Sequence, residues 1–153
     1  MSLPEKVRLG DLLLQQKLIT EEQLTIALDQ QKRNKLRLGR ILFNNGFVSE
    51  ENISRTLARQ FDLPYFELRD FPIKPEIVRI MPESLARQFH AIILEIRKDR
   101  LLVGMVDPTD QDAISGIEEI VNSGIDVAVV TEGQFLAALD RGYWRTQEIT
   151  GQK

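Results

Sequence analysis

Two copies of the triplet Arg-Leu-Gly, each with a glutamine 23 residues after its arginine, are the residues of this chain best suited to binding chemistry. They are Arg8, Leu9, Gly10 and Gln31 in the first copy and Arg37, Leu38, Gly39 and Gln60 in the second. An arginine offers a planar fork of donors that binds phosphate or stacks on a base, and a glutamine amide both donates to and accepts from a base edge. Two such sets would match a ligand with two bases and two phosphates. The alternative is that Arg and Gln are solvated helix ends and that the glycine only permits a tight turn.

The two sets belong to an internal repeat. Residues 8–31 and 37–60 are 24-residue units that are offset by 29 positions and separated by a five-residue spacer. Eight of the 24 positions are identical, whereas chance at average composition would give about one or two. Most of the other pairs are similar in kind, such as Leu12 with Ile41 and Thr20 with Ser49. The chain therefore contains a duplicated structural unit.

Each unit is predicted to form a helical hairpin, because its apolar residues recur with helical spacing. Thr20 and Ser49 are predicted to cap the second helices, and Gln23 completes a capping box in the first copy. Gly46 is predicted to end the first helix of the second copy, and Lys17 occupies that place in the first, where a positive φ costs more. The predicted buried stripes of the second helices are Leu24, Ala27 and Leu28 in one copy and Ile53, Leu57 and Ala58 in the other.

The pattern changes after residue 60. Pro64 predicts an extended connector over residues 61–70. The elements predicted beyond it are a short helix at 83–89, two strands joined by a turn at Lys98–Asp99, a helix at 111–122 closed by Gly124, a strand at 126–131 and a final helix capped by Thr131. The predicted fold class is α+β: an N-terminal all-helical unit of two tandem helical hairpins (1–62), a small α+β subdomain with about three strands (63–143), and a polar linker (144–153) toward a further C-terminal domain.

The composition excludes several classes of function. The absence of cysteine excludes disulfides and thiol catalysis, and the single histidine, His90, cannot form a metal cluster. No Gly-Lys dipeptide occurs, so this chain holds no Walker-type P-loop, and no catalytic apparatus or metal is predicted. The net charge is −3, and no apolar run approaches the roughly 20 residues that span a bilayer. Because the N-terminal segment also lacks the apolar core of a signal peptide, a cytoplasmic protein without direct membrane insertion is predicted.

The distribution of charge suits a small anionic ligand, and the alternative is chance segregation of charges on solvated faces. Residues 1–60 hold ten Lys and Arg against seven Asp and Glu, and residues 61–153 hold ten against sixteen. This N-terminal excess is too weak for binding nucleic acid by charge alone. Paired short helices resemble a helix-turn-helix nucleic-acid binder, but the symmetrical Arg…Gln spacing and the negative net charge disfavour that function.

The doubled pattern, with its Arg-Leu-Gly start, spaced aliphatic residues and final Gln, resembles the MshEN domain. That domain is the N-terminal regulatory region of ATPases that drive the MSHA pilus and related type II secretion and type IV pilus machines, and the family binds cyclic di-GMP. The order of elements after residue 60, including Val106–Asp110, is also similar to the N-terminal domain of type II secretion ATPases.

This resemblance implies that cyclic di-GMP lies extended across both units. Arg8 and Arg37 would contact guanine or phosphate, and Gln31 and Gln60 would donate or accept hydrogen bonds. The residues implied to give close backbone and apolar contact are Leu9, Gly10, Leu38 and Gly39, with Leu24, Leu28, Ile53 and Leu57 as an apolar floor. The resemblance also suggests that Asp107 reaches the ligand, where its carboxylate could accept from guanine N1–H and N2–H₂. The alternative is that Asp107 only shapes the turn before Pro108.

Two functional hypotheses follow. In the first, the chain senses cyclic di-GMP, requires no cofactor and signals to an attached C-terminal ATPase domain. In the second, it is a protein-docking module that anchors the ATPase to an inner-membrane platform protein, so that the protein is peripheral to the inner membrane. The two roles can coexist.

Overall fold

The computed structural model describes residues 9–144, and the side chain of Trp144 is not part of that description. The first half of the chain is helical, with α1 (Leu9–Gln15), α2 (Glu21–Asn34), α3 (Leu38–Asn44) and α4 (Glu50–Gln60). These four helices form the two predicted hairpins, and residues 9–60 are called the helical unit below. Arg8 and the predicted linker residues 145–153 lie outside the described residues.

The predicted helix ends within the helical unit are confirmed. The Thr20 hydroxyl accepts from the Gln23 amide at 3.1 Å, and the Gln23 side chain accepts from the Thr20 amide at 3.0 Å, which completes the capping box. The Ser49 hydroxyl accepts from the Asn52 amide at 3.0 Å. Lys17 and Gly46, which are equivalent in the repeat, both have positive φ, at 62° and 77°.

The second half, called the α+β part (residues 61–144), contains a three-stranded sheet surrounded by short helices. Its elements are η1 (Leu68–Asp70), α5 (Pro75–Val78), α6 (Glu83–Phe89), β1 (Ala91–Arg97), β2 (Arg100–Met105), α7 (Gln111–Val121), β3 (Gly124–Val129), α8 (Glu132–Leu139) and η2 (Asp140–Trp144). The predicted α+β class and the three strands are confirmed. The sequence pattern gave no indication of α5.

The sheet has the order β1-β2-β3, with β1 and β2 antiparallel and β2 and β3 parallel. The parallel pair is possible because α7 carries the chain back between β2 and β3. Gly124 was expected to close α7, but this prediction was wrong. Asn122 ends the helix in the left-handed conformation, at φ 54°, and Gly124 already begins β3. Asparagine can take this role because its short polar side chain tolerates positive φ.

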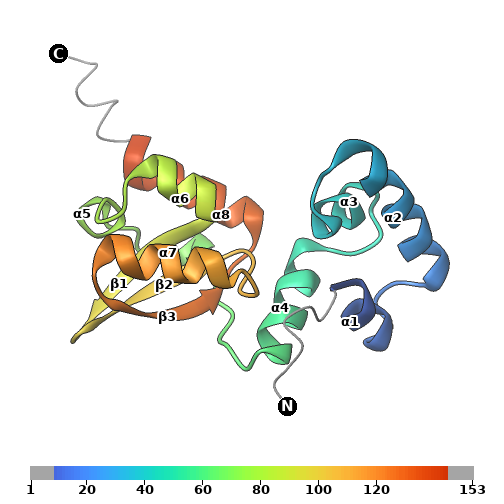
Figure 1. Cartoon of the computed structure of the whole chain (residues 1–153), viewed down its shortest axis with the longest axis horizontal. Coiled ribbons are helices and arrows are strands. Elements are labelled where there is room, and N and C mark those ends of the chain that lie inside the picture. The colour runs from blue at the N-terminus through green and yellow to red at the C-terminus, as the bar shows by residue number, and fades with distance from the viewer. Residues whose placement is uncertain (1–8, 145–153) are drawn as a thin grey trace.

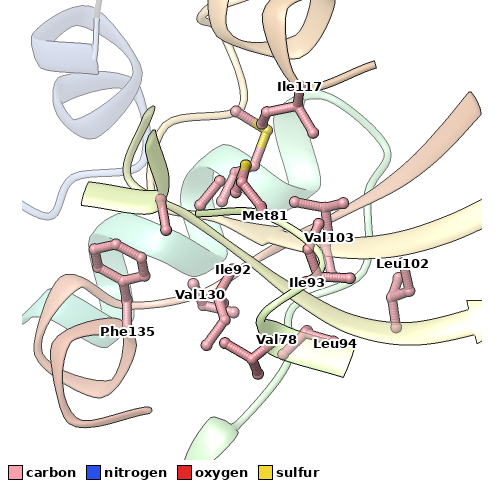
Figure 2. Packing of buried hydrophobic residues seen from close by; sticks show 14 of the residues in the cluster. Val78, Met81, Ile92, Ile93, Leu94, Leu102, Val103, Ile117, Val130 and Phe135 are labelled. Atoms are coloured by element: carbon pink, nitrogen blue, oxygen red, sulfur yellow. The ribbon is translucent and has the colours of Figure 1, made fainter. Parts of the chain in front are cut away.

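The main core lies on both sides of the sheet. Consecutive residues of β1 and β2 are buried, and because successive strand residues point to opposite faces, both faces must be covered. Figure 2 shows part of this packing, where Ile92, Ile93 and Val103 lie among neighbouring side chains such as Met81, from the segment between α5 and α6, and Phe135 of α8.

The helical unit packs on the α+β part through α4. In Figure 1 the helical unit lies beside the α+β part. A small buried cluster of Leu12, Leu57, Ala58 and Val129 joins α1 and α4 to β3, and the Ser54 hydroxyl donates to the Val130 carbonyl at 3.4 Å.

This contact gives different burial to two residues that are equivalent in the repeat. Leu57 is 8% exposed, whereas Leu28 is 38% exposed. The prediction that Leu28 belongs to a buried stripe was therefore wrong. The physical reason is that Leu57 belongs to the apolar cluster that includes Val129, whereas Leu28 is outside the buried clusters of both halves.

Within residues 9–144, no helix combines the length and the apolar character needed to cross a membrane.

Candidate functional site

A cavity of about 330 Å³ lies where the helical unit meets the α+β part. The helical unit supplies most of its wall, and the α+β part closes it with the segment after β2 and the first residue of α8. The lining residues are Leu9, Gln31, Arg37, Leu38, Gly39, Arg40, Phe43, Glu50, Ile53, Ser54 and Leu57 from the helical unit, and Val106, Asp107, Thr109 and Glu132 from the α+β part. Both apolar side chains and charged groups therefore face one space.

The structure brings together eight of the residues singled out in the sequence. These are Leu9, Gln31, Arg37, Leu38, Gly39, Ile53, Leu57 and Asp107. The Gln31 side chain donates to the Leu36 carbonyl at 3.0 Å, so in this structure it also holds the spacer between the repeats.

Four other described residues from that set do not line the cavity. Gly10 is buried and lies against Leu24, which packs inside the helical unit. Leu28 and Gln60 are exposed. The structure thus places the two repeats differently: the second repeat contributes most of the wall, and the first contributes Leu9 and Gln31.

Arg37 and Asp107 form an ion pair in the wall of the cavity. Arg37 precedes α3 in an extended conformation, and its guanidinium lies 3.4 Å from Oδ2 of Asp107. The other carboxylate oxygen, Oδ1, accepts from the Thr109 amide at 3.0 Å and from the Thr109 hydroxyl at 2.6 Å. Asp107 therefore shapes the turn, as one alternative expected, and it also lines the cavity as the ion-pair partner of Arg37.

A second arginine, Arg40, makes shorter ion pairs. Its guanidinium donates to Glu50 at 2.9 Å and to Glu132 at 2.7 Å, and it lies 5.1 Å above the ring of Phe43. Burial lowers the pKa of Arg40, but hydrogen bonds and charge from Glu132 and Glu50 outweigh this and raise the pKa above its ordinary value. Arg40 is therefore a permanently charged group of the cavity wall.

His90 is influenced by the charges of this site. It ends α6 in the left-handed conformation at φ 52°, and its carbonyl accepts from the Val106 amide at 3.1 Å. Burial, followed by the positive charge of Arg37, lowers the pKa of His90. The imidazole is thus held neutral over a wider range of pH than a free histidine.

The sequence did not single out Arg40, Glu132 or Thr109 as site residues. The sequence could have indicated Arg40, because the two repeats differ in charge at this position, where the first repeat has Asp11. Glu132 had none, because it lies 92 residues from Arg40 in the chain. Over the described part of the chain, no three acidic or imidazole side chains gather in a way that could hold a metal ion.

The sequence profile of the MshEN domain matches residues 61–148, which is more than half of the chain. The chain belongs to the MshEN domain family. The match covers the α+β part, whereas the duplicated pattern that first indicated the family lies in residues 8–60. The MshEN profile and the repeat therefore indicate the same family from different parts of the chain.

Curated relatives of this MshEN domain are longer proteins. The chain is 29% identical over 136 residues to the type IV pilus assembly ATPase PilB of Myxococcus xanthus (strain DK1622), which covers 89% of the chain and 24% of that protein. It is 30% identical to bacteriophage adsorption protein B of Escherichia coli (strain K12), over 90% of the chain and 18% of that protein. The chain thus spans about a quarter or less of these relatives.

Solved structures share the fold of this MshEN domain. A structure of MshE with cdg (cyclic di-GMP) is 34% identical, with a TM-score of 0.75, and the match covers 89% of the chain and 99% of that structure. The N-terminal domain of XpsE has a TM-score of 0.78 at 22% identity, over 94% of the chain and 99% of that structure, which shows the common fold. The helical unit and the α+β part therefore recur together in these proteins.

Proposed function

We propose that this MshEN domain binds cyclic di-GMP in the cavity between the helical unit and the α+β part. The observation that carries the proposal is the convergence of Arg37, Gln31 and Asp107, three polar side chains from separate segments, around an apolar wall. Pockets of this kind, mostly apolar with a few convergent polar groups, are typical of small-molecule sites.

The chemistry of the wall fits a guanine nucleotide. The Arg37 guanidinium can bind a phosphate or stack on the base. Oδ2 of Asp107, which pairs with Arg37, can accept from guanine N1–H and N2–H₂, and Thr109 fixes the carboxylate through its other oxygen. Leu9, Ile53 and Leu57 supply an apolar surface for the face of the base.

The cavity volume indicates how much of the ligand it encloses. About 330 Å³ lies at the low end of the range of small-molecule sites. We therefore expect one nucleotide half to enter the cavity and the other half to lie along the first repeat. Arg8 is the proposed phosphate or base contact there, because it is the repeat equivalent of Arg37. The structure of MshE with cyclic di-GMP, a 34% identical relative, supports the same ligand class.

We further propose that the chain is the N-terminal regulatory part of a pilus-extension or secretion ATPase in the cytoplasm. The PilB relatives of two organisms support this, because the chain matches only 24% and 16% of their lengths. The ATPase chemistry would then reside in a domain outside this sequence, which has no Gly-Lys dipeptide.

Isothermal titration calorimetry with cyclic di-GMP tests the proposal, with cyclic di-AMP and GTP as specificity controls. We expect one dinucleotide per chain. Arg37→Ala and Arg8→Ala should each weaken binding by at least about 1.5 kcal/mol, as expected for loss of a charge-assisted contact.

Arg33→Ala is the matched control, because Arg33 is an exposed arginine paired with Asp29 away from the cavity. It should leave affinity almost unchanged. Binding that is equally strong in the folded Arg37→Ala, Arg8→Ala and Arg33→Ala proteins would reject the assigned site. No binding by the unmodified chain would reject the ligand and leave the protein-docking hypothesis.

A further inference from the structure

The ion-pair cluster of Arg40, Glu50 and Glu132 connects three helices at the edge of the cavity. Arg40 lies on α3, Glu50 begins α4 and Glu132 begins α8. Glu50 also accepts from the Gly133 amide at 3.2 Å through its second oxygen. This cluster therefore fastens the helical unit to the first turn of α8.

The cluster is the most buried set of ion pairs among the described residues. The side chains of Arg40, Glu50 and Glu132 are 24%, 22% and 24% exposed, whereas the Arg37–Asp107 pair is 42% and 37% exposed. Charges that are shielded from water interact more strongly, because the effective dielectric constant is lower. A change of partner at Arg40 therefore has a larger energetic effect than at the exposed pairs.

Arg40 also breaks the symmetry of the repeat. The equivalent residue of the first repeat is Asp11, which has the opposite charge, although Glu50 and its equivalent Glu21 are identical. Two acidic groups share one guanidinium in this cluster, so it carries an excess of negative charge beside the cavity. An anionic ligand entering there is repelled by the carboxylates and attracted by Arg40.

We propose that Arg40 is a further ligand-binding residue of the cavity, for which the anionic ligand and Glu132 compete. The inference rests on the proposed function, because it takes a cyclic dinucleotide phosphate as the competing anion. Since Arg40 cannot donate the same N–H groups to both at full strength, ligand binding weakens the connection between α3 and α8. By thermodynamic linkage, the connection to Glu132 lowers the affinity for the ligand by the same factor.

A double-mutant cycle tests this competition by titration with cyclic di-GMP. Glu132→Gln, which removes the charge and keeps the shape, should tighten binding about threefold to tenfold, and Arg40→Gln should weaken it about tenfold. In the Arg40→Gln background, Glu132→Gln should change affinity less than twofold. A general effect of removing negative charge would instead tighten binding equally in both backgrounds, and that result would overturn the inference.

Two further variants keep the test decisive. Asp29→Asn removes an equally negative charge from the exposed pair with Arg33 and should change affinity by less than twofold at physiological salt. If Arg40→Gln does not fold, Arg40→Lys serves as the second background, because lysine lacks the fork that binds two carboxylates. There, Glu132→Gln should tighten binding less than in the unmodified protein, and equal tightening would overturn the competition.

The outcomes separate the two proposals. If the unmodified protein binds cyclic di-GMP and Glu132→Gln leaves the affinity unchanged or weakens it, the role of Arg40 is overturned. The proposed function then remains intact. Failure of the unmodified protein to bind cyclic di-GMP overturns both.

Discussion

Leu9 of the first repeat lies against Gly39 of the second, and the equivalent contact is made by Leu38 of the second repeat with Gly10 of the first. A Cβ on Gly39 would stand 3.3 Å from Cδ2 of Leu9, and a Cβ on Gly10 would stand 3.4 Å from Cδ2 of Leu38. Gly39 lies next to Ile53, and Gly10 lies next to its equivalent, Leu24. The first helices of the two repeats therefore pack against each other with approximate two-fold symmetry, which only small residues at positions 10 and 39 permit.

The two glycines should respond differently to alanine. Gly39→Ala requires a small movement of Leu9, and alanine favours a helix by about 1 kcal/mol, so the free energy of unfolding should change by less than about 1 kcal/mol. Gly10→Ala places a Cβ 2.7 Å from Leu24 in a buried position and should cost about 1–3 kcal/mol. Urea denaturation measures both, and an equal or smaller loss for Gly10→Ala would contradict the packing described.

Lys17 and Gly46 give a matched pair for backbone strain. Both have positive φ, which a residue with a Cβ adopts at a cost of about 1–2 kcal/mol. Lys17→Gly should therefore raise the free energy of unfolding by up to about 1 kcal/mol, and Gly46→Ala should lower it by about 1 kcal/mol. Thermal and urea unfolding test this. Neither residue lines the cavity, so a large change in ligand affinity would show that the variants disturb more than these turns.

His90 should make the fold less stable in acid. Its folded pKa lies below the ordinary value of 6.5 because of burial and then the charge of Arg37. As pH falls, the unfolded chain therefore binds a proton near pH 6.5, before the folded chain does. The contribution of His90 to the free energy of unfolding is thus complete above pH 6.5 and is lost as pH falls through the folded pKa. His90→Asn, which tolerates positive φ, should lose less stability below pH 6.5 than the unmodified chain. Parallel acid profiles for the two proteins in urea denaturation would contradict this.

Tyr143 anchors η2 to the segment after α5. Its hydroxyl lies 3.0 Å from the Val78 carbonyl and 2.6 Å from the Met81 carbonyl and can donate to either. Tyr143→Phe should lower the free energy of unfolding by about 0.5–1.5 kcal/mol at neutral pH, the usual contribution of a hydrogen bond.

The same substitution has an alkaline test. Burial raises the pKa of Tyr143 from 10.0 to about 12. As pH rises, the unfolded chain therefore loses the phenol proton before the folded chain does. The contribution of Tyr143 to the free energy of unfolding is complete below pH 10 and is lost as pH rises toward 12. The difference in stability between the unmodified protein and Tyr143→Phe should shrink over that range, and a constant difference would contradict the prediction.

The sequence by itself determined the features that depend on neighbouring residues. The capping box of Thr20 and Gln23, the positive φ of Lys17 and the strands on either side of Lys98–Asp99 follow from local backbone geometry and side-chain periodicity. The repeat itself was also visible, because identical units impose the same local rules on two segments.

Only the tertiary structure decided how the two copies differ. Leu28 and Leu57 are identical in the repeat, yet only Leu57 joins the buried cluster with Val129. Arg40 and Glu132 meet although 92 positions separate them. A duplicated sequence gives each copy the same local structure, but the α+β part packs mainly against α4 of the second copy. The burial of each copy, and the charges that line the cavity, are therefore set by contacts between distant segments.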